Sequence, residues 1–384
     1  MQKKIPFYDL TLSPATRRAV ERTLKGGWIT TGPAVSQFEA EVGKLLGIKH
    51  TAAVSSATAG LVLALRAVGV KQGDEVITTP FSFVAGAEAI LHLGAVPVFA
   101  DIDPATLNIN PVSVGKRITG RTAAILAVDI AGYPCDYRTL GLLAKAHRIP
   151  LVSDSAHALG ARLDGKSIPH WTDLSVYSFH ATKNLTCGEG GMAVSRDKNL
   201  VARVRLWSKH GMTASAYERK QADQWSYDVI ERGFKANMSD ILASVGLGEL
   251  QSFAKNQVKR EQLAIRYLSN LSMVEDWITV PRLQLGYHHA WHLMIVGLNL
   301  SRLTVSRNAV IDLMARRGIG CSVHYRPIHT LSFFRKSKLR TARLPEAERM
   351  GKSVVSLPLY PGLSPSDVDR ISDTLISICR RHAR

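Results

Sequence analysis

The feature that most constrains the fold is an alternation of short apolar strands with amphipathic helices over the first two hundred residues. The pattern predicts strands at 52–54, 75–79, 96–100, 123–128 and 150–153, with further strand candidates at 174–179 and 191–195. It predicts helices at 35–46, 59–68, 84–93 and 137–147. Such an alternation indicates an α/β fold whose large, mostly parallel sheet carries helices on both faces. In these sheets ligands bind at the carboxyl ends of the strands.

The pattern changes near residue 245. Glu249–Leu271 is rich in Lys, Arg and Gln and is predicted to form one long helix that bridges two domains. A strand at 290–298 and helices at 307–317 and 366–378 predict a smaller C-terminal α/β domain. We therefore expect a large domain over 1–248 and a small domain over 249–384.

Composition excludes several classes of protein. Apolar residues make up 46% and charged residues 21% of the 384, which is ordinary globular usage. No apolar run reaches the ~18–20 residues of a membrane span, and the first residues lack the apolar core of a secretion signal. We therefore expect a cytoplasmic protein. The four cysteines lie far apart with no C-x-x-C pair, so we expect reduced thiols and no metal site.

The charge balance is unusual. Lys and Arg number 49 and Asp and Glu 31, a net charge of +18. Residues 301–384 carry 16 basic and six acidic side chains, or +10. Such a surface attracts nucleic acid, acidic membranes or phosphorylated metabolites. No nucleic-acid-binding signature accompanies it, so nucleic acid is an unlikely partner. The use of the basic surface at Arg335, Lys336, Lys338, Arg340 and Arg343 stays open.

Three predicted strand ends carry chemistry. Ser55 to Thr58 join a strand to a helix, where small residues and free amides suit a phosphate, although Ser and Thr also cap helices routinely. Asp154 follows a buried strand, where a carboxylate needs a cationic partner such as a pyridinium N–H, or else caps a helix. Lys183 follows another apolar strand among small residues, a setting that favours the neutral amine of a Schiff-base lysine.

These motifs together resemble the DegT/DnrJ/EryC1/StrS family of sugar aminotransferases. The resemblance rests on GWITTGP (27–33), GDEVI (73–77), SDSAHA (153–158) and SFHATKN (178–184), and on WHL (291–293), GIG (318–320), HYRPIH (324–329) and SLPL (356–359). The C-terminal blocks most resemble the branch that aminates C4 of UDP-linked 4-keto sugars. The resemblance implies the fold-type I architecture of enzymes that use pyridoxal 5′-phosphate.

The resemblance also implies roles for individual residues. Lys183 matches the lysine that forms the internal aldimine, and Asp154 matches the acid on the pyridine nitrogen. His157 matches a neighbour of the ring, and Phe83 an aromatic residue over the cofactor face. The residues implied to cradle the phosphate are Ser56, Ala57, Thr58 and Ser178, with Asn237 reaching in from the partner subunit. The implied enzyme is thus a homodimer with shared active sites.

One motif departs from the family pattern. Relatives usually have Glu-Asp-Ala-Ala where this chain has Ser153-Asp154-Ser155-Ala156, so we expect altered polarity around the ring. Lys183 itself is present, whereas relatives that act as dehydratases carry histidine there.

The implied reaction moves an amino group from glutamate, which leaves as 2-oxoglutarate, to a keto nucleotide-linked sugar, most simply a 4-keto sugar. Candidate contacts to this substrate are His324, Tyr325, Arg326 and His329, although these side chains could instead bridge the two domains. Two alternatives stay open: a family member that acts at another sugar position or nucleotide, and a non-catalytic regulatory or nucleic-acid-binding homologue. Sugar, nucleotide and physiological amino donor are not fixed by the sequence.

Overall fold

The alternating elements form one seven-stranded sheet in a computed structural model that describes residues 3–223, 225–337 and 343–384. The strands are β1 (His50–Val54), β2 (Glu75–Thr78), β3 (Val96–Phe99), β4 (Thr122–Val128), β5 (Leu151–Asp154), β8 (Leu174–Ser178) and β9 (Gly191–Ser195). Their order is β1-β9-β8-β5-β4-β2-β3, and only β9 runs antiparallel to its neighbours. The predicted α/β fold with a mostly parallel sheet is confirmed, and each predicted strand of this sheet is present within two residues.

Helices cover both faces of this sheet. One face packs against α3 (Ala57–Ala67), α4 (Ala85–His92) and α7 (Lys198–Ser208). The other face packs against α2 (Pro33–Leu46), α5 (Pro111–Gly115), α6 (Tyr137–His147) and the first half of α9 (Asp240–Leu271). Because both faces are buried, the strands are mostly apolar, and the buried polar side chains on them are functional candidates.

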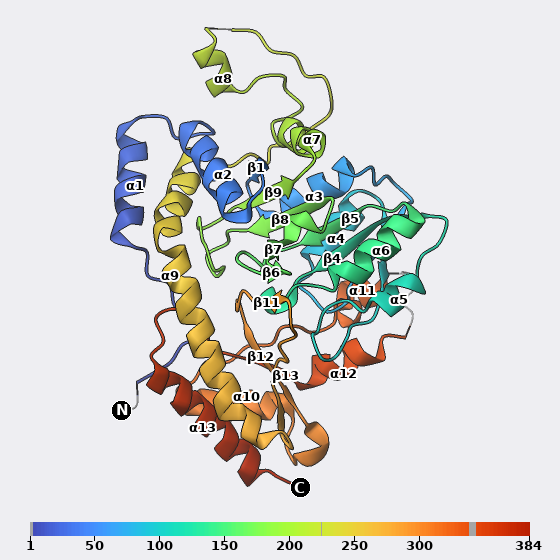
Figure 1. The fold of residues 1–384 in the computed structure, drawn as a ribbon, viewed down its shortest axis with the longest axis vertical. Helices are drawn as coiled ribbons and strands as arrows, with labels where there is room; N and C mark the ends of the chain where they lie inside the picture. The colour runs from blue at the N-terminus through green and yellow to red at the C-terminus, as the bar shows by residue number, and fades with distance from the viewer. Residues whose placement is uncertain (1–2, 224, 338–342) are drawn as a thin grey trace.

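The long helix α9 links the sheet to the C-terminal region (Figure 1). It begins at Asp240, nine residues before the predicted start at Glu249. Its first turns are buried and lack the Lys- and Gln-rich pattern on which the prediction rested. Ser239 caps the helix, and the Asp240 carboxylate accepts hydrogen bonds from Gly32 N (2.8 Å) and Val35 N (3.0 Å) at the start of α2.

The C-terminal region builds a second core. A three-stranded antiparallel sheet contains β10 (Ile278–Thr279), β12 (Met294–Leu298) and β13 (Val354–Leu357). It packs against the second half of α9, α10 (Arg307–Arg316) and α13 (Pro365–Arg381). The strand predicted at 290–298 begins only at Met294, because His292 N hydrogen-bonds to Ala131 O and Trp291 has a positive φ of 49°.

The remaining elements are peripheral. They are α1 (Pro14–Lys25), α8 (Ala216–Gln221), α11 (Ser332–Lys336), α12 (Pro345–Ser353) and a small sheet of β6 (Arg162–Leu163), β7 (Lys166–Ser167) and β11 (Tyr287–His288). The segment that carries α8 projects away from the rest of the chain (Figure 1). In the described ranges no helix is long and apolar enough to cross a membrane. Of the basic surface, Lys338 and Arg340 lie outside the described residues.

Candidate active site

A cavity of ≈ 350 Å³ opens at the carboxyl ends of β1, β5 and β8. Ten of the residues singled out from the sequence line it: Ser56, Ala57, Thr58, Phe83, Asp154, His157, Ser178, Lys183, His324 and Tyr325. Three others, Asn237, Arg326 and His329, are not among its lining residues. The fold therefore brings together residues that are far apart in the sequence, at the edge of the sheet where ligands are expected.

The start of α3 forms one wall of the cavity. Ser56 caps the helix, and its Oγ accepts a hydrogen bond from Ala59 N at 3.1 Å. The amides of Ala57 and Thr58 belong to the first turn, whose N–H groups have no carbonyl four residues before them inside the helix. Gly191 of β9 passes so closely that a Cβ there would lie 2.6 Å from Ala57 N. The wall is thus a set of small residues and helix-terminal amides, which suits an anion.

Asp154 and Lys183 provide opposite charges in the cavity wall. Asp154 is 6% exposed, its Oδ1 accepts a hydrogen bond from Ala156 N (3.1 Å), and its burial raises the carboxyl pKa. Burial lowers the pKa of Lys183 to about 8, although the Asp154 carboxylate opposes that shift. An amine with this pKa is partly neutral near pH 7–8 and can act as a nucleophile or a base.

His157 lies next to this pair. Burial, with the positive charge of Lys183, lowers the pKa of the imidazole well below its usual value, so the ring is neutral. Its Nε2 lies 3.3 Å from the Tyr325 hydroxyl, and its ring packs on His292 with 4.4 Å between centroids. Its Nδ1 is buried and has no hydrogen-bond partner within the described chain. A buried imidazole nitrogen without a partner is one that a ligand can satisfy.

The N-terminal segment lines the cavity next to the C-terminal region. Phe7 stacks on His324 with 5.5 Å between ring centroids, and the Tyr8 hydroxyl donates a hydrogen bond to Ala181 O. His324 Nδ1 also lies 2.8 Å from Ser356 Oγ on β13, in the three-stranded C-terminal sheet. Burial lowers the pKa of His324 to about 4, with Lys183 contributing in the same direction.

The segment 324–329 sends its side chains in two directions. His324 and Tyr325 line the cavity, but the Arg326 guanidinium donates to Thr330 O at 2.8 Å and to Thr330 Oγ1 at 3.2 Å. His329 Nε2 lies 3.2 Å from a carboxylate oxygen of Glu348. Neither side chain lines the cavity, and the hydrogen-bond partners of both, Thr330 and Glu348, lie in the same C-terminal region, so these contacts do not bridge the two predicted domains.

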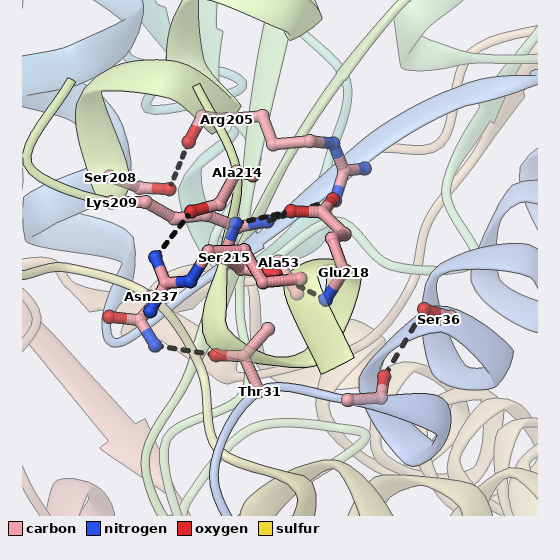
Figure 2. Close-up of polar contacts among 12 residues, drawn as sticks. Thr31, Ser36, Ala53, Arg205, Ser208, Lys209, Ala214, Ser215, Glu218 and Asn237 are labelled. Atoms are coloured by element: carbon pink, nitrogen blue, oxygen red, sulfur yellow. Dashed lines mark hydrogen bonds and ion pairs between the residues drawn. The ribbon is translucent and has the colours of Figure 1, made fainter. Parts of the chain in front are cut away.

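Asn237 lies outside the cavity of its own chain. Its Nδ2 donates to Thr31 Oγ1, as Figure 2 shows, and its Oδ1 accepts from Lys235 Nζ at 2.6 Å. Figure 2 also shows that this region neighbours the base of the α8 segment, where Lys209 pairs with Glu218. This position is compatible with the expectation that Asn237 serves the site of a partner subunit.

The residues that line the cavity fit pyridoxal phosphate. The first turn of α3 suits a phosphate, and Asp154 suits a protonated ring nitrogen. Lys183 has the lowered pKa that a covalent link to an aldehyde requires. The unpartnered Nδ1 of His157 leaves a polar position for the ligand, and Phe83 offers an exposed ring beside it. This chain therefore has a suitable residue for each part of the cofactor.

Several cavity residues were not found from the sequence. Phe7 and Tyr8 precede any periodic pattern. His292 lies in the motif WHL (291–293), which indicated the family resemblance but no role for this histidine. His292 Nδ1 lies 3.1 Å from Asn184 Oδ1, one residue beyond Lys183.

Comparisons with known proteins agree with this geometry. The model of the DegT/DnrJ/EryC1/StrS aminotransferase family matches residues 11–376. The spore coat polysaccharide biosynthesis protein SpsC of Bacillus subtilis is 39% identical over 386 residues, covering 99% of each chain. The putative sugar aminotransferase Spr1654 of Streptococcus pneumoniae, in its PLP form, is 31% identical with a TM-score of 0.90, covering 99% of each chain. DesI, solved in the presence of its TDP-sugar product, is 29% identical with a TM-score of 0.89, covering 99% of this chain and 94% of its own.

The fold is that of the aminotransferases to which these structures belong. The chain belongs to the DegT/DnrJ/EryC1/StrS aminotransferase family, and the resemblance recognised in the sequence is confirmed.

Proposed function

We propose that this chain uses pyridoxal 5′-phosphate to transfer an amino group from glutamate to a keto sugar linked to a nucleotide, with a 4-keto sugar as the simplest acceptor. The observation that carries the proposal is that Lys183 and Asp154 lie in one buried cavity with the start of α3. A reactive amine, an acid for a ring nitrogen and a phosphate-binding helix terminus are the three groups that this cofactor needs.

The bound cofactor would supply an aldehyde for covalent attachment and a ring that accepts electrons. Lys183 would bind to that aldehyde and, once displaced by the amino donor, would move a proton at the α-carbon of the donor. Asp154 would hold the proton on the ring nitrogen, and the neutral His157 would meet the ring without adding charge. Family membership supports these assignments.

The acceptor side of the cavity supports a sugar nucleotide. His324 and Tyr325 provide neutral hydrogen-bonding groups for hydroxyls, since burial lowers the pKa of His324 and raises that of Tyr325. DesI was solved with a TDP-sugar product, so a structurally similar enzyme accommodates a sugar nucleotide. Arg326 and His329 stay candidates for the diphosphate, although they contact Thr330 and Glu348 in this chain.

The direct test is a substrate screen. The holoenzyme is incubated with glutamate and, separately, UDP-, dTDP- and GDP-linked 4-keto sugars, and formation of 2-oxoglutarate and of the amino sugar is followed. We expect one nucleotide series to give stoichiometric products. If a 3-keto sugar, and none of the 4-keto sugars, drives 2-oxoglutarate formation beyond one equivalent per active site, the acceptor position is wrong. If no donor converts the bound cofactor, the proposed function is wrong.

We further propose that the active form is a homodimer. The α8 segment exposes large apolar side chains, among them Trp225 (92% exposed), Tyr227, Val229, Ile230 and Phe234. An exposed apolar surface of this kind is typical of protein interfaces. Asn237 follows the same segment and lies outside its own cavity, so a second copy docked on this segment could receive it.

Mixing two inactive variants tests this arrangement. Lys183→Ala and Asn237→Ala are combined under conditions that allow subunits to exchange. If each site takes Lys183 from one chain and Asn237 from the other, mixed dimers contain one native site, and about a quarter of the sites recover. If both residues serve the same chain, no native site can form and activity stays absent. Analytical ultracentrifugation of the native chain measures the dimer itself.

A further inference from the structure

A continuous chain of buried side-chain hydrogen bonds lies behind Asp154. The participating residues are Tyr137 on α6, Asp129 after β4, Ser153 and Ser155 at the end of β5, and Thr172 and Ser175 at β8. None of these side chains is more than 4% exposed. The chain includes both serines at which this sequence departs from the family motif around Asp154.

Asp129 is the acceptor on which the chain converges. The Tyr137 hydroxyl donates to its Oδ1 at 2.7 Å, Cys135 N donates to Oδ1 at 3.0 Å, and Ser155 Oγ donates to Oδ2 at 2.7 Å. No ion pair to Asp129 occurs among the residues described. A buried carboxylate without a cation is costly, so its three donors must hold their places for it to be tolerated.

Asp129 also holds the chain directly after Asp154. Its backbone N donates to Asp154 O at 3.1 Å, and its side chain accepts from Ser155, the residue that follows β5. Val128 and Asp154 are paired in the register of β4 and β5. These two hydrogen bonds thus fix the peptide between Asp154 and Ser155, next to the carboxylate that faces the cavity.

The other hydroxyls extend this support across the sheet. Ser155 Oγ lies 3.0 Å from Ser153 Oγ, which donates to Ser175 Oγ at 2.7 Å, and Ser175 Oγ lies 2.8 Å from Thr172 Oγ1. Ser153 lies on β5 and Ser155 follows the strand two residues later, and both hydroxyls belong to this network. An alanine at 155 would retain the backbone hydrogen bond from Asp129 N to Asp154 O but would remove the hydrogen bond to the Asp129 side chain.

Titratable groups from several elements face Asp129. Tyr137 faces it from α6, Cys135 from the preceding loop, Asp154 from β5 and Tyr177 from β8. Burial raises the pKa of Asp129 to about 6, while the hydrogen bonds from Tyr137, Cys135 and Ser155 oppose that shift. The negative charge of Asp154 raises this pKa further, which places the two carboxyls within electrostatic range of each other.

We propose that Asp129 is a positioning residue that, through Ser155 and the backbone of Asp154, holds the Asp154 carboxylate in place for the cofactor ring. This inference rests on the proposed function, because it assigns to Asp154 the contact with the ring nitrogen. Asp129 itself lies outside the cavity, and its role is to determine how tightly Asp154 holds the cofactor ring.

The test compares Ser155→Ala with a matched control, Thr51→Val. Both substitutions remove one buried hydroxyl from the large sheet, but Thr51 lies at the amino end of β1, where its Oγ1 donates to Glu39 O at 3.1 Å. The readouts are the dissociation constant of pyridoxal phosphate, the absorbance of the bound cofactor as a function of pH, and the denaturant midpoint. Asp129→Asn, which keeps the shape of the side chain, is measured as a second variant.

We expect Ser155→Ala to weaken cofactor binding by about tenfold and to shift the pH dependence of the absorbance, since a hydrogen bond that orients a charged partner is lost. Asp129→Asn should weaken binding at least as much. Thr51→Val should lower the denaturant midpoint without changing either cofactor readout. If the Ser155 and Asp129 variants lose stability but keep native affinity and absorbance, the network is only structural and the inference is wrong. If the native chain binds no pyridoxal phosphate, the proposed function fails and this inference fails with it.

Discussion

The two walls of the cavity are built in different ways. The wall from the seven-stranded sheet consists of strand ends and a helix start, with Asp154 buried, Lys183 partly buried, and the pKa values of both shifted. The wall from the C-terminal region is an irregular segment in which His324 and Tyr325 line the cavity and Arg326 does not. The first wall holds charged groups in fixed positions, as chemistry requires. The second offers neutral hydrogen-bonding groups, as recognition of a sugar requires.

This difference predicts that substitutions in the wall from the seven-stranded sheet reduce turnover, whereas those in the wall from the C-terminal region change substrate affinity.

The largest effect is expected for Lys183→Ala. Removal of the amine deletes both the covalent attachment and the proton transfer, so kcat should fall by about 10⁴-fold or more. Single-turnover kinetics and the absorbance of bound cofactor measure the loss. Lys166→Ala, at an exposed lysine of the β6–β7 hairpin, is the control and should behave as the native enzyme. Retained turnover in Lys183→Ala would rule out its assigned role.

The second-largest effect is expected for Asp154→Asn. The amide keeps the shape but cannot hold a proton on the ring nitrogen, so kcat should fall by about 10²-fold or more with a smaller change in KM. Asp164→Asn removes a carboxylate from a surface pair with Arg138 and serves as control. A change in KM alone would show that Asp154 acts in substrate binding and not in turnover.

The pH dependence tests the environment of Lys183. The folded pKa, about 8, lies below the ordinary value of 10.5, so the neutral amine is favoured in the folded apo chain. Capture of pyridoxal phosphate should therefore accelerate as pH rises through about 8. The same shift should make the apo chain more stable as pH rises from 8 towards 10.5, because the unfolded chain still binds the proton. Stopped-flow absorbance measures the first effect and denaturant titration the second. A midpoint near 10 would show an exposed lysine.

The smallest effects are expected in the segment 324–329. Tyr325→Phe removes the hydroxyl that lies 3.3 Å from His157 Nε2 and should lower kcat/KM by about three- to tenfold.

Arg326→Ala tests whether the Arg326 guanidinium contacts the substrate. If Arg326 makes only its hydrogen bonds to Thr330 and does not contact the substrate, the KM for the sugar nucleotide stays within about twofold of the native value. A KM raised tenfold with kcat unchanged would restore Arg326 as a substrate contact.

Whether a cavity residue can be placed from the sequence depends on whether it lies at the end of a strand or in an irregular segment. The strands and their order along the chain follow from apolar periodicity, and parallel strands bring their carboxyl ends to one edge, so Lys183, Asp154 and Ser56 could be placed together. Arg326 could not be placed in the same way. In an irregular segment no periodicity decides which side chain turns inward, and the contact with Thr330 is a tertiary detail.

The beginning of α9 and the role of Asp129 were missed for a related reason. The first turns of α9, before Glu249, consist largely of small and apolar residues. They are buried against α1 and α2, so the sequence there has no polar face by which the helix could be recognised. Asp129 looks like any acid after a strand, and only the fold shows that Tyr137 and Ser155 converge on it.

The central claim is that Lys183 and Asp154 form the reactive centre of an aminotransferase. The most direct measurement is a single half-reaction of the holoenzyme with glutamate alone, in which 2-oxoglutarate and the form of the bound cofactor are both quantified. We expect one 2-oxoglutarate per active site, full conversion of the cofactor to its amine form, and neither product with Lys183→Ala. Cofactor that binds but stays unconverted by glutamate or by any other amino acid would contradict it.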